Sequence, residues 1–506
     1  MKKDVVILFF PLVDRSRYYS NFPFSILYLE RMLRESNIEV VLIDERLNPD
    51  YQKTIKSYKE RILLVGVSAI IGYQAISGIR FSKFSKTITD APIIWGGWFP
   101  TIFTEVLLKE NYVDFICSGQ GEFLIKELVN ALINNISIEN IENLSFKKNK
   151  ELFIKKPGKL FDSFSLPAPD YSLVNVDKLI NINGIVDPSH RGIDYQATIG
   201  CPHECYFCNL VFVFESKWFS QKTEVIIEDM ILFKAKHNVK NVTFCDDNFF
   251  SNKKFIISFC EKVIQNNIDI TWEANAHVSS FLHFFKEAEV ELMYKAGCRK
   301  IKIGVESGDQ EVLDRINKKC TVEQNIEIVR LLKKYKIAVQ YFTMVCFPFN
   351  PEKDFNNTLK MIGKAKTIYP ELEANINYFI PIPGTQLYPI AQSYGFSFPE
   401  NMPDLIEFIS NDLKTPWFKD TYKEKLRYFI EFYFRFAKFG NYRNYYGLKK
   451  VWMFLVSLRI YPICYFRMKT GFFALSFDAW FYLKLFNRKN KPVDFDFIES
   501  HRTKKI

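Results

Sequence analysis

Three cysteines lie within eight residues of this 506-residue chain, at Cys201, Cys205 and Cys208. Their spacing, three residues between the first two and two between the last two, puts three thiols on one short loop. Three thiolates can hold three irons of a 4Fe–4S cluster and leave the fourth iron without a protein ligand. An iron with an open coordination position can bind and activate a small molecule. The spacing therefore favours a catalytic iron–sulfur cluster.

Other chemistries of this loop stay open on spacing alone. Structural zinc takes four ligands, usually from two separated Cys/His pairs, so the fourth would have to come from His203 or from a distant residue. A redox pair needs only two cysteines separated by two residues. A disulfide is not expected in a cytosolic chain, and the scatter of the other seven cysteines indicates reduced thiols without a second metal site.

The charge divides the chain into a neutral body and a basic tail. The net charge is +11, yet residues 421–506 alone carry 18 Lys and Arg against 6 Asp and Glu, a balance of +12. The same segment holds 25 of the 83 Phe, Trp and Tyr residues. No uncharged apolar run is long enough to span a bilayer, and the first ten residues predict a strand rather than a signal peptide. We expect the tail to form helices whose aromatic side chains pack on the rest of the protein. The alternatives are that the tail binds anionic lipid, covers an apolar substrate or binds nucleic acid.

The first 140 residues alternate short apolar strands with helices. Strands are predicted at 4–10, 38–44, 62–68, 92–95 and 113–117, and helices near 24–36, 72–88 and 101–110. This alternation predicts a doubly wound α/β sheet, in which ligands bind at the carboxyl ends of the strands. The loops at those ends contain the candidate binding residues Ser68, Gly96, Gly97, Pro100, Thr101, Gly119, Gly121 and Glu122.

The alternation resumes near residue 191 and predicts a partial (β/α) barrel. Strands are expected at 195–199, 241–245, 268–274, 300–305, 339–344 and 373–378, and the first runs straight into the cysteine loop. Catalytic groups of such barrels lie on the C-terminal face. The polar or special residues after these strands include Asp246, Asp247, His277, Glu306, Ser307, Pro383 and Gly384. A Glu there can accept hydrogen bonds from ribose hydroxyls, whereas His277 is expected to be structural.

Taken together, these motifs resemble the radical S-adenosylmethionine enzymes that carry an N-terminal cobalamin-binding domain. The cysteine loop, residues 246–249, 303–308 and 382–388 resemble the barrel of that family, and residues 96–101 and 119–122 resemble its cobalamin domain. The resemblance covers about residues 4–395. It implies four regions: a Rossmann-like cobalamin-binding domain (1–140), a linker (141–190), a radical enzyme barrel (191–400) and a mainly helical C-terminal region (401–506).

The resemblance also implies the cofactors and their ligands. Cys201, Cys205 and Cys208 would hold the 4Fe–4S cluster, and its open iron would bind S-adenosylmethionine for cleavage to a 5′-deoxyadenosyl radical. Candidate S-adenosylmethionine contacts are Asp246, Asp247, Glu306, Ser307, Pro383 and Gly384, and the eight loop residues of the first domain are candidates for cobalamin. No catalytic residue is assigned. The first 189 residues contain no histidine, so this domain would give cobalt no imidazole ligand.

The reaction expected from the resemblance is methyl transfer to an unactivated carbon of a small or lipid-like metabolite. The nearest rival is a cyclase, rearranging or oxidative enzyme of the same architecture without methyl transfer. Rivals of another class are a non-catalytic relic and a tRNA methylthiotransferase, which would need a second cysteine trio where Cys117 stands alone. The expected partners are a small-molecule substrate, an electron donor such as flavodoxin or ferredoxin and, through the tail, a membrane surface, with no nucleic acid. The expected location is the cytoplasm or the membrane periphery.

Overall fold

The chain forms two compact units in a computed structural model that describes residues 3–13, 22–180, 191–410, 415–437, 447–473 and 476–486. The first unit contains Met1–Asp194, Phe212–Glu215 and Ser397–Leu413, and the second contains Tyr195–Val211, Ser216–Phe396 and Lys414–Ile506. Most of the expected linker therefore belongs to the first unit. Its last ten residues, 181–190, and the end of the C-terminal region, 487–506, lie outside the described residues.

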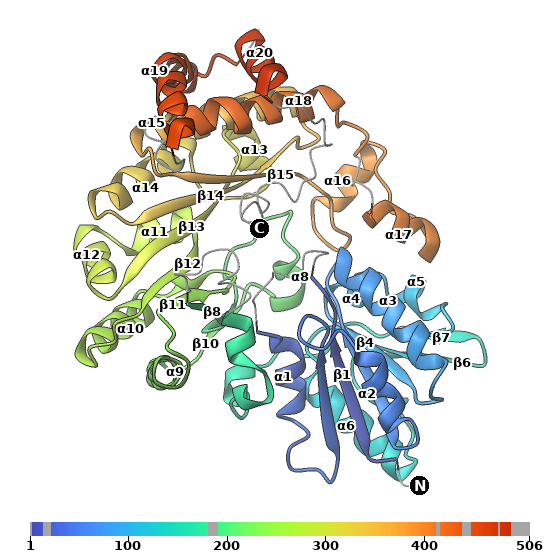
Figure 1. Cartoon of the computed structure of the whole chain (residues 1–506). Helices are drawn as coiled ribbons and strands as arrows, with labels where there is room; N and C mark the ends of the chain where they lie inside the picture. Colours follow the sequence, from blue (N-terminus) through green and yellow to red (C-terminus); the bar gives the residue numbers. More distant parts are fainter. Residues whose placement is uncertain are drawn as a thin grey trace. The chain divides into compact units, whose positions relative to one another are not determined.

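A seven-stranded sheet of order β2-β1-β3-β4-β5-β6-β7 forms the centre of the first unit (Figure 1). Strands β1 to β5 are parallel, and β6 and β7 are antiparallel additions. The order reverses between β1 and β3, where doubly wound sheets bind their ligands. This confirms the predicted doubly wound fold. The strands are β1 (Val5–Phe10), β2 (Glu39–Asp44), β3 (Ile62–Ser68), β4 (Ile93–Gly96), β5 (Phe115–Cys117), β6 (Leu144–Lys148) and β7 (Glu151–Phe153).

Helices cover both faces of this sheet because its central strands are apolar on both sides. On one face, Leu8 lies in a core with Leu128 of α6. On the other, the ring of Phe9 stacks on Phe81 of α3 with centroids 3.7 Å apart. One predicted helix, near 101–110, is instead two short helices that meet at Phe103. The helices are α1 (Phe24–Glu30), α2 (Tyr51–Tyr58), α3 (Tyr73–Lys86), α4 (Trp98–Ile102), α5 (Thr104–Leu108), α6 (Glu122–Asn134) and α17 (Met402–Ser410).

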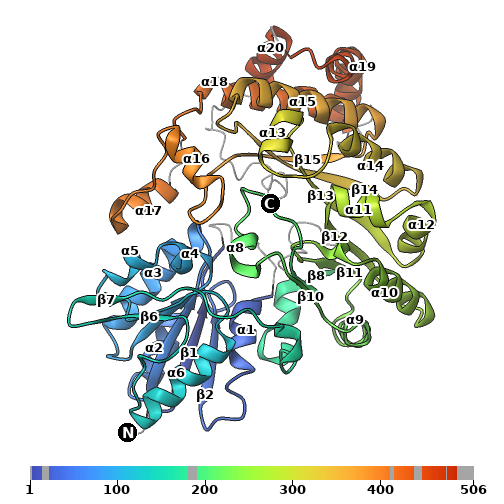
Figure 2. The ribbon, with the colours of Figure 1, turned by 180° about the vertical axis from the view of Figure 1, so that it is seen from behind.

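The second unit is a curled six-stranded sheet of order β15-β14-β13-β12-β11-β8, with helices along its outer side (Figure 2). The pairs from β11 to β15 are parallel, which confirms the predicted partial barrel. The strands are β8 (Gly192–Tyr195), β11 (Asn241–Phe244), β12 (Thr271–His277), β13 (Cys298–Glu306), β14 (Ala338–Val345) and β15 (Glu373–Tyr378). The helices that connect them are α9 (Thr223–His237), α10 (Lys253–Gln265), α11 (Val278–Phe284), α12 (Glu287–Lys295), α13 (Gln310–Arg315), α14 (Val322–Lys334) and α15 (Pro351–Ile368).

Two predicted strands of the barrel are wrong in detail. The strand expected at 195–199 is broken, because β8 ends at Tyr195 and residues 198–200 form β9, which pairs with β10 (Trp218–Ser220) in a separate ribbon. The strand expected at 268–274 runs from Thr271 to His277. Its polar residue Asn275 is accommodated within the sheet because its amide donates to the carbonyl of Asp246.

The C-terminal region adds helices to the second unit, which confirms the predicted helical region. Some of its aromatic residues pack on the body as expected, whereas others are exposed. Helix α19 packs closely on α15, where a side chain at Gly363 would come within 2.6 Å of the Met468 carbonyl oxygen. No helix in the described part of the chain is both long enough and apolar enough to cross a membrane. The remaining helices are α8 (Leu210–Phe214), α16 (Tyr388–Ser393), α18 (Asp420–Tyr428), the π-helix η4 (Phe429–Phe434), α19 (Gly447–Thr470) and α20 (Phe477–Phe486).

Candidate functional site

The cysteine loop is held against the segments that follow the barrel strands. The Gly200 N–H donates to Asp247 Oδ2 at 2.9 Å, which ties the start of the loop to the end of β11. The Tyr206 N–H donates to the Ile316 carbonyl at 3.0 Å, and the Tyr206 carbonyl accepts from the Leu387 N–H at 2.9 Å. The loop is thus fixed by segments after β11, β13 and β15, on the face where barrel enzymes bind substrates.

Polar groups face two of the three sulfur atoms. Asn248 Nδ2 donates to Cys201 Sγ at 3.7 Å, and His277 Nε2 lies 3.9 Å from Cys205 Sγ. Burial raises the pKa of the free Cys205 thiol to about 11 and that of Cys208 to about 12. Hydrogen bonds to sulfur stabilise metal-bound thiolates, so this donor set fits an iron–sulfur cluster. Among the described residues, no three His, Cys, Asp or Glu side chains are arranged to hold a single metal ion.

Two histidines close one side of the loop. The rings of His203 and His277 stack with centroids 3.6 Å apart. The His203 ring contacts the Ser280 hydroxyl, and His277 Nδ1 lies 2.9 Å from the Ser279 hydroxyl. Burial lowers the pKa of His203 to about 4 and that of His277 well below its usual value. Both rings are therefore neutral at pH 7 and can donate or accept hydrogen bonds without adding charge beside the sulfur atoms.

The two aspartates after β11 contact the backbone that leads into the cysteines. Asp246 is fully buried and accepts from the Thr198 N–H, while Asp247 accepts from Gly200. Burial raises the pKa of Asp246 to about 8. The contacts of these two side chains with the backbone therefore position β9 and the cysteine loop.

A buried ion pair that the sequence analysis missed lies at the end of β13. Glu306 Oε1 is 2.8 Å from Lys318 Nζ, and both residues are less than 10% exposed, at 8% and 4%. Burial disfavours the charge of Lys318, but Glu306 and then Cys205 raise its pKa above the usual value, so it stays protonated. Two adjacent lysines in a polar stretch usually indicate solvent exposure, so the sequence carried no signal for this burial.

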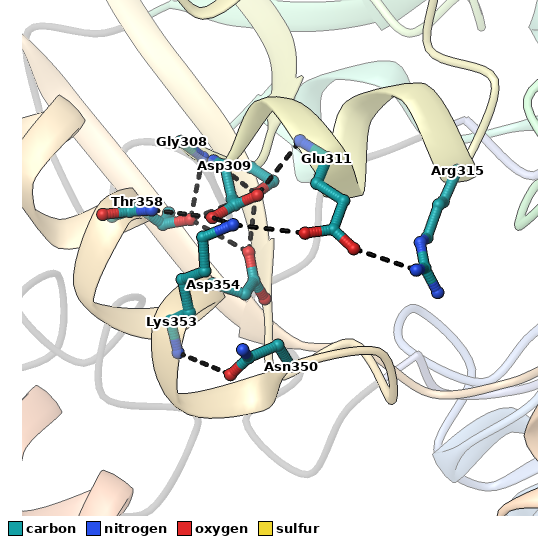
Figure 3. Close-up of polar contacts among 10 residues, drawn as sticks. Gly308, Asp309, Glu311, Arg315, Asn350, Lys353, Asp354 and Thr358 are labelled. Atoms are coloured by element: carbon teal, nitrogen blue, oxygen red, sulfur yellow. Dashed lines mark hydrogen bonds and ion pairs between the residues drawn. The ribbon is translucent and has the colours of Figure 1, made fainter.

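Ser307 and Gly308 are held by α15. Figure 3 shows Gly308 beside Thr358 of this helix. The fully buried Ser307 hydroxyl donates to Asp354 Oδ1 at 2.6 Å and accepts from the Asp309 N–H at 2.9 Å. The Gly308 N–H donates to Thr358 Oγ1 at 2.8 Å. Glycine is required there, because a Cβ at Gly308 would lie 2.4 Å from a backbone oxygen of α15. The hydroxyl predicted to bind cofactor is thus engaged with the protein in this structure.

Asp354 should make the stability of this unit depend on pH. Burial raises its pKa from 3.8 to about 6, although hydrogen bonds from Ser307 and the Phe347 N–H oppose the shift. The native state therefore favours the protonated carboxyl, and this contribution is complete below pH 3.8 and is lost as the pH rises through 6. Between these pH values the wild type should lose about 3 kcal/mol relative to Asp354→Asn. Urea unfolding at several pH values measures this difference; a difference that does not vary with pH would contradict it.

The turn after β15 also lies beside the cysteine loop. Gly384 is exposed and has a φ of +87°, a conformation that favours glycine, and Pro383 is half-buried. The Thr385 hydroxyl closes the turn by donating to the Ile382 carbonyl at 2.7 Å. Because Leu387 bonds to the loop at Tyr206, the turn is brought to the same face as the cysteines.

In the first unit, the predicted loops contact one another at the carboxyl ends of the strands. Gly97 has a φ of +97°, and a Cβ there would lie 2.7 Å from the Ala69 carbonyl oxygen. The Thr101 hydroxyl donates to the Gly97 carbonyl at 2.8 Å and accepts from the Gly119 N–H at 3.4 Å. Ser68 is half-buried at the end of β3. Glycine at position 97 therefore allows two loops to pack closely at the edge where doubly wound sheets bind their ligands.

Three other predicted residues of this unit make structural contacts. Glu122 is buried and accepts from Arg31 Nη2 at 3.1 Å and from the Ser163 hydroxyl. This pair ties α1 and α6 to the segment at Ser163. Pro100 is buried in α4, and a side chain at Gly121 would come within 3.2 Å of Cys117 Sγ. The structure thus brings Gly97, Thr101 and Gly119 together, with Gly96 bonded to Ala69 beside them, and directs Glu122 into a structural ion pair.

Comparison with known families agrees with both units. Residues 195–362 match the model of the radical SAM superfamily, and residues 12–129 match the model of the B12 binding domain. The chain is a radical SAM enzyme with a B12-binding domain. Here SAM denotes S-adenosylmethionine, and B12 is cobalamin.

Three similar proteins illustrate the family. An uncharacterized methyltransferase of Pyrococcus horikoshii, PH0819, is 27% identical over 378 residues, 73% of this chain and 78% of that protein. The anaerobic magnesium-protoporphyrin IX monomethyl ester cyclase of Synechocystis sp. is 24% identical over 347 residues, 67% of this chain and 68% of that protein. The structure of OxsB, a cobalamin-dependent S-adenosylmethionine radical enzyme, superposes with a TM-score of 0.70 at 16% identity, over 98% of this chain and 74% of OxsB. At that identity the likeness to OxsB concerns the fold.

Proposed function

We propose that this radical SAM enzyme uses cobalamin to methylate an unactivated carbon of a small or lipid-like metabolite. The main support is the cysteine loop, whose three free thiols are fixed over the barrel with Asn248 and His277 at the sulfur atoms. Bound by Cys201, Cys205 and Cys208, a 4Fe–4S cluster would supply the electron that splits SAM and yields a 5′-deoxyadenosyl radical. The protein's own residues bind and orient the reactants.

The SAM contacts follow from charge and position. The Glu306 carboxylate can accept from ribose hydroxyls, and Lys318, a buried cation whose charge acts on Cys205, can pair with the SAM carboxylate. Gly384 and Pro383 offer an exposed turn beside the same loop, which can approach the nucleoside. Asp246 and Asp247 set the position of the loop through the backbone of β9.

Cobalamin is assigned to the edge of the first sheet formed by the loops at Gly97, Thr101 and Gly119. The absence of histidine from residues 1–189 supports cobalt without an imidazole from this domain. Electron paramagnetic resonance of the bound cob(II)alamin checks this part of the proposal. Nitrogen coupling from a protein ligand would contradict it.

Product analysis with the full chain tests the reaction. The protein is reconstituted anaerobically with iron, sulfide and hydroxocobalamin, reduced, and given SAM with a deuterated methyl group together with small-molecule or lipid extracts. Methyl transfer should give 5′-deoxyadenosine together with S-adenosylhomocysteine, and a product that carries the label. Formation of 5′-deoxyadenosine alone, with an unlabelled product, would instead support a cyclase, rearranging or oxidative enzyme. The 24% identity to the Synechocystis cyclase is the reason to test this alternative. Failure to form either product would favour a non-catalytic relic.

The proposed partners follow from the same chemistry. The substrate is a small molecule, and the electron comes from a donor such as flavodoxin or ferredoxin. A tRNA methylthiotransferase would need a second cysteine trio, whereas residues 1–194 contain Cys117 alone, so no nucleic-acid substrate is proposed. The ten cysteines are free thiols, which supports a location in the reducing cytoplasm.

A further inference from the structure

Helices α19 and α20 lie at the edge of the second unit (Figure 1). Each has one apolar stripe that is buried and a second apolar stripe that is exposed. The first stripe of α19 is buried and includes Cys464 and Met468, both 0% exposed, against η4 and α15. The second stripe is exposed, with residues spaced by four, three and eight positions as one side of a helix requires. Its residues are Val451 (58% exposed), Leu455 (55%), Leu458 (47%) and Phe466 (61%).

The shorter helix α20 repeats this pattern. Ala479 and Leu483 are buried, at 0% and 6% exposed, on the side packed in the protein. Phe477, Trp480 and Phe481 are 72%, 45% and 60% exposed on the other side. Large apolar residues gathered in this number on exposed helix surfaces mark an interaction site, whereas single exposed ones are ordinary.

The charges beside these stripes have one sign. Residues 447–486 contain six Lys and Arg but one acidic residue, Asp478. Asp478 is engaged inside the protein, because it pairs with Arg467 at 2.8 Å and accepts from the Tyr433 hydroxyl at 2.7 Å. The exposed basic residues Lys469 and Lys484 lie on the apolar stripes themselves, three residues after Phe466 and Phe481 respectively.

We propose that this outer face of α19 and α20, termed the α19–α20 face, docks on an anionic lipid bilayer. The aromatic and aliphatic side chains would enter the boundary between headgroups and acyl chains, and the lysines would meet lipid phosphates and carboxylates. Long basic side chains suit this place because their stems lie along apolar surface while their charges stay in the polar layer. The charge of the face favours an anionic surface over a neutral one. The inference is independent of the proposed methyl transfer.

Flotation of the full-length protein with vesicles tests the docking. Vesicles of phosphatidylcholine with phosphatidylserine should carry the protein to the top of a gradient, and vesicles of phosphatidylcholine alone should carry less. The triple variant Phe466→Gln, Phe477→Gln, Phe481→Gln should bind the anionic vesicles at least about tenfold more weakly. A matched control, Ile136→Gln with Ile154→Gln, changes residues of the first unit that are 56% and 51% exposed and should bind like the wild type.

A charge variant separates lipid docking from other uses of the face. Lys469→Glu with Lys484→Glu keeps the apolar stripes, should fold normally because both residues are exposed, and should lose the preference for phosphatidylserine. The proposal is overturned if the wild type does not float, or if the triple variant floats as the wild type does. It is also overturned if light scattering shows a wild-type dimer that the triple variant abolishes while vesicle binding is unchanged, since the face would then join two copies of the chain.

Discussion

Replacing Cys205 with alanine is expected to abolish both the cluster and the cleavage of SAM. Cys205 is the most deeply placed of the three cysteines, at 6% exposure, with His277 3.9 Å from its sulfur. Two remaining thiols cannot hold three irons, so iron and sulfide should fall from about four each per chain to background. Formation of 5′-deoxyadenosine should fall with them, because the electron reaches SAM through the cluster. Iron and acid-labile sulfide assays of the reconstituted protein, with product analysis, measure both effects.

Cys320→Ala is the matched control for this loss. Cys320 is also buried, at 5% exposure, and its charge interaction with Cys205 shows that it lies in the same region, but its sulfur contacts the Asn325 side chain. This variant should keep iron, sulfide and product formation. Equal loss in both variants would make Cys320 part of the metal site. If the wild-type protein contains zinc but no sulfide, and reconstitution does not change its metal content, the cysteines hold structural zinc instead.

The architecture was predictable because it depends on local patterns. Strand β3 begins and ends where the apolar run 62–68 predicts it, and β15 coincides with 373–378. The break between β8 and β9 was not predictable, because it depends on a bond between Thr198 and Asp246, which are 48 positions apart. Periodicity along one strand carries no information on such a distant partner.

The position of the cysteine loop on the barrel was predictable from the sequence, but the contacts around the cysteines were not. Spacing identified the loop, since three thiols must be close in sequence to share one short turn. The burial of Lys318 and the engagement of Ser307 with Asp354 depend on elements brought together by the fold. The ion pair of Glu122 with Arg31 was likewise not predictable, because it depends on the packing of α1 on α6.

Lys318→Met should weaken both the fold and the binding of SAM. Methionine retains most of the apolar length of lysine but leaves the buried Glu306 carboxylate without its partner at 2.8 Å. Breaking a buried ion pair from one side costs about 3–5 kcal/mol, measurable by urea unfolding of the second unit. If Lys318 pairs with the SAM carboxylate, losing that charge-assisted bond should weaken SAM binding about 10- to 100-fold, measurable by equilibrium dialysis.

The double variant Glu306→Gln, Lys318→Met separates these two roles. It removes both charges together, so most of the lost stability should return, because no uncompensated charge stays buried. SAM binding should not return, because the proposed ion pair between Lys318 and the SAM carboxylate is still missing, while the glutamine oxygen at position 306 can still accept from the ribose hydroxyls. Recovery of SAM binding would leave the pair with a structural role only. Lys302→Met supplies the control: Lys302 lies 2.6 Å from Glu273 at the neighbouring strands, and both side chains are partly exposed, at 18% and 26%. That change should lower the free energy of unfolding by about 1 kcal/mol or less and leave SAM binding intact. This result would show that the effect on binding belongs to Glu306 and Lys318 and not to every ion pair of the barrel.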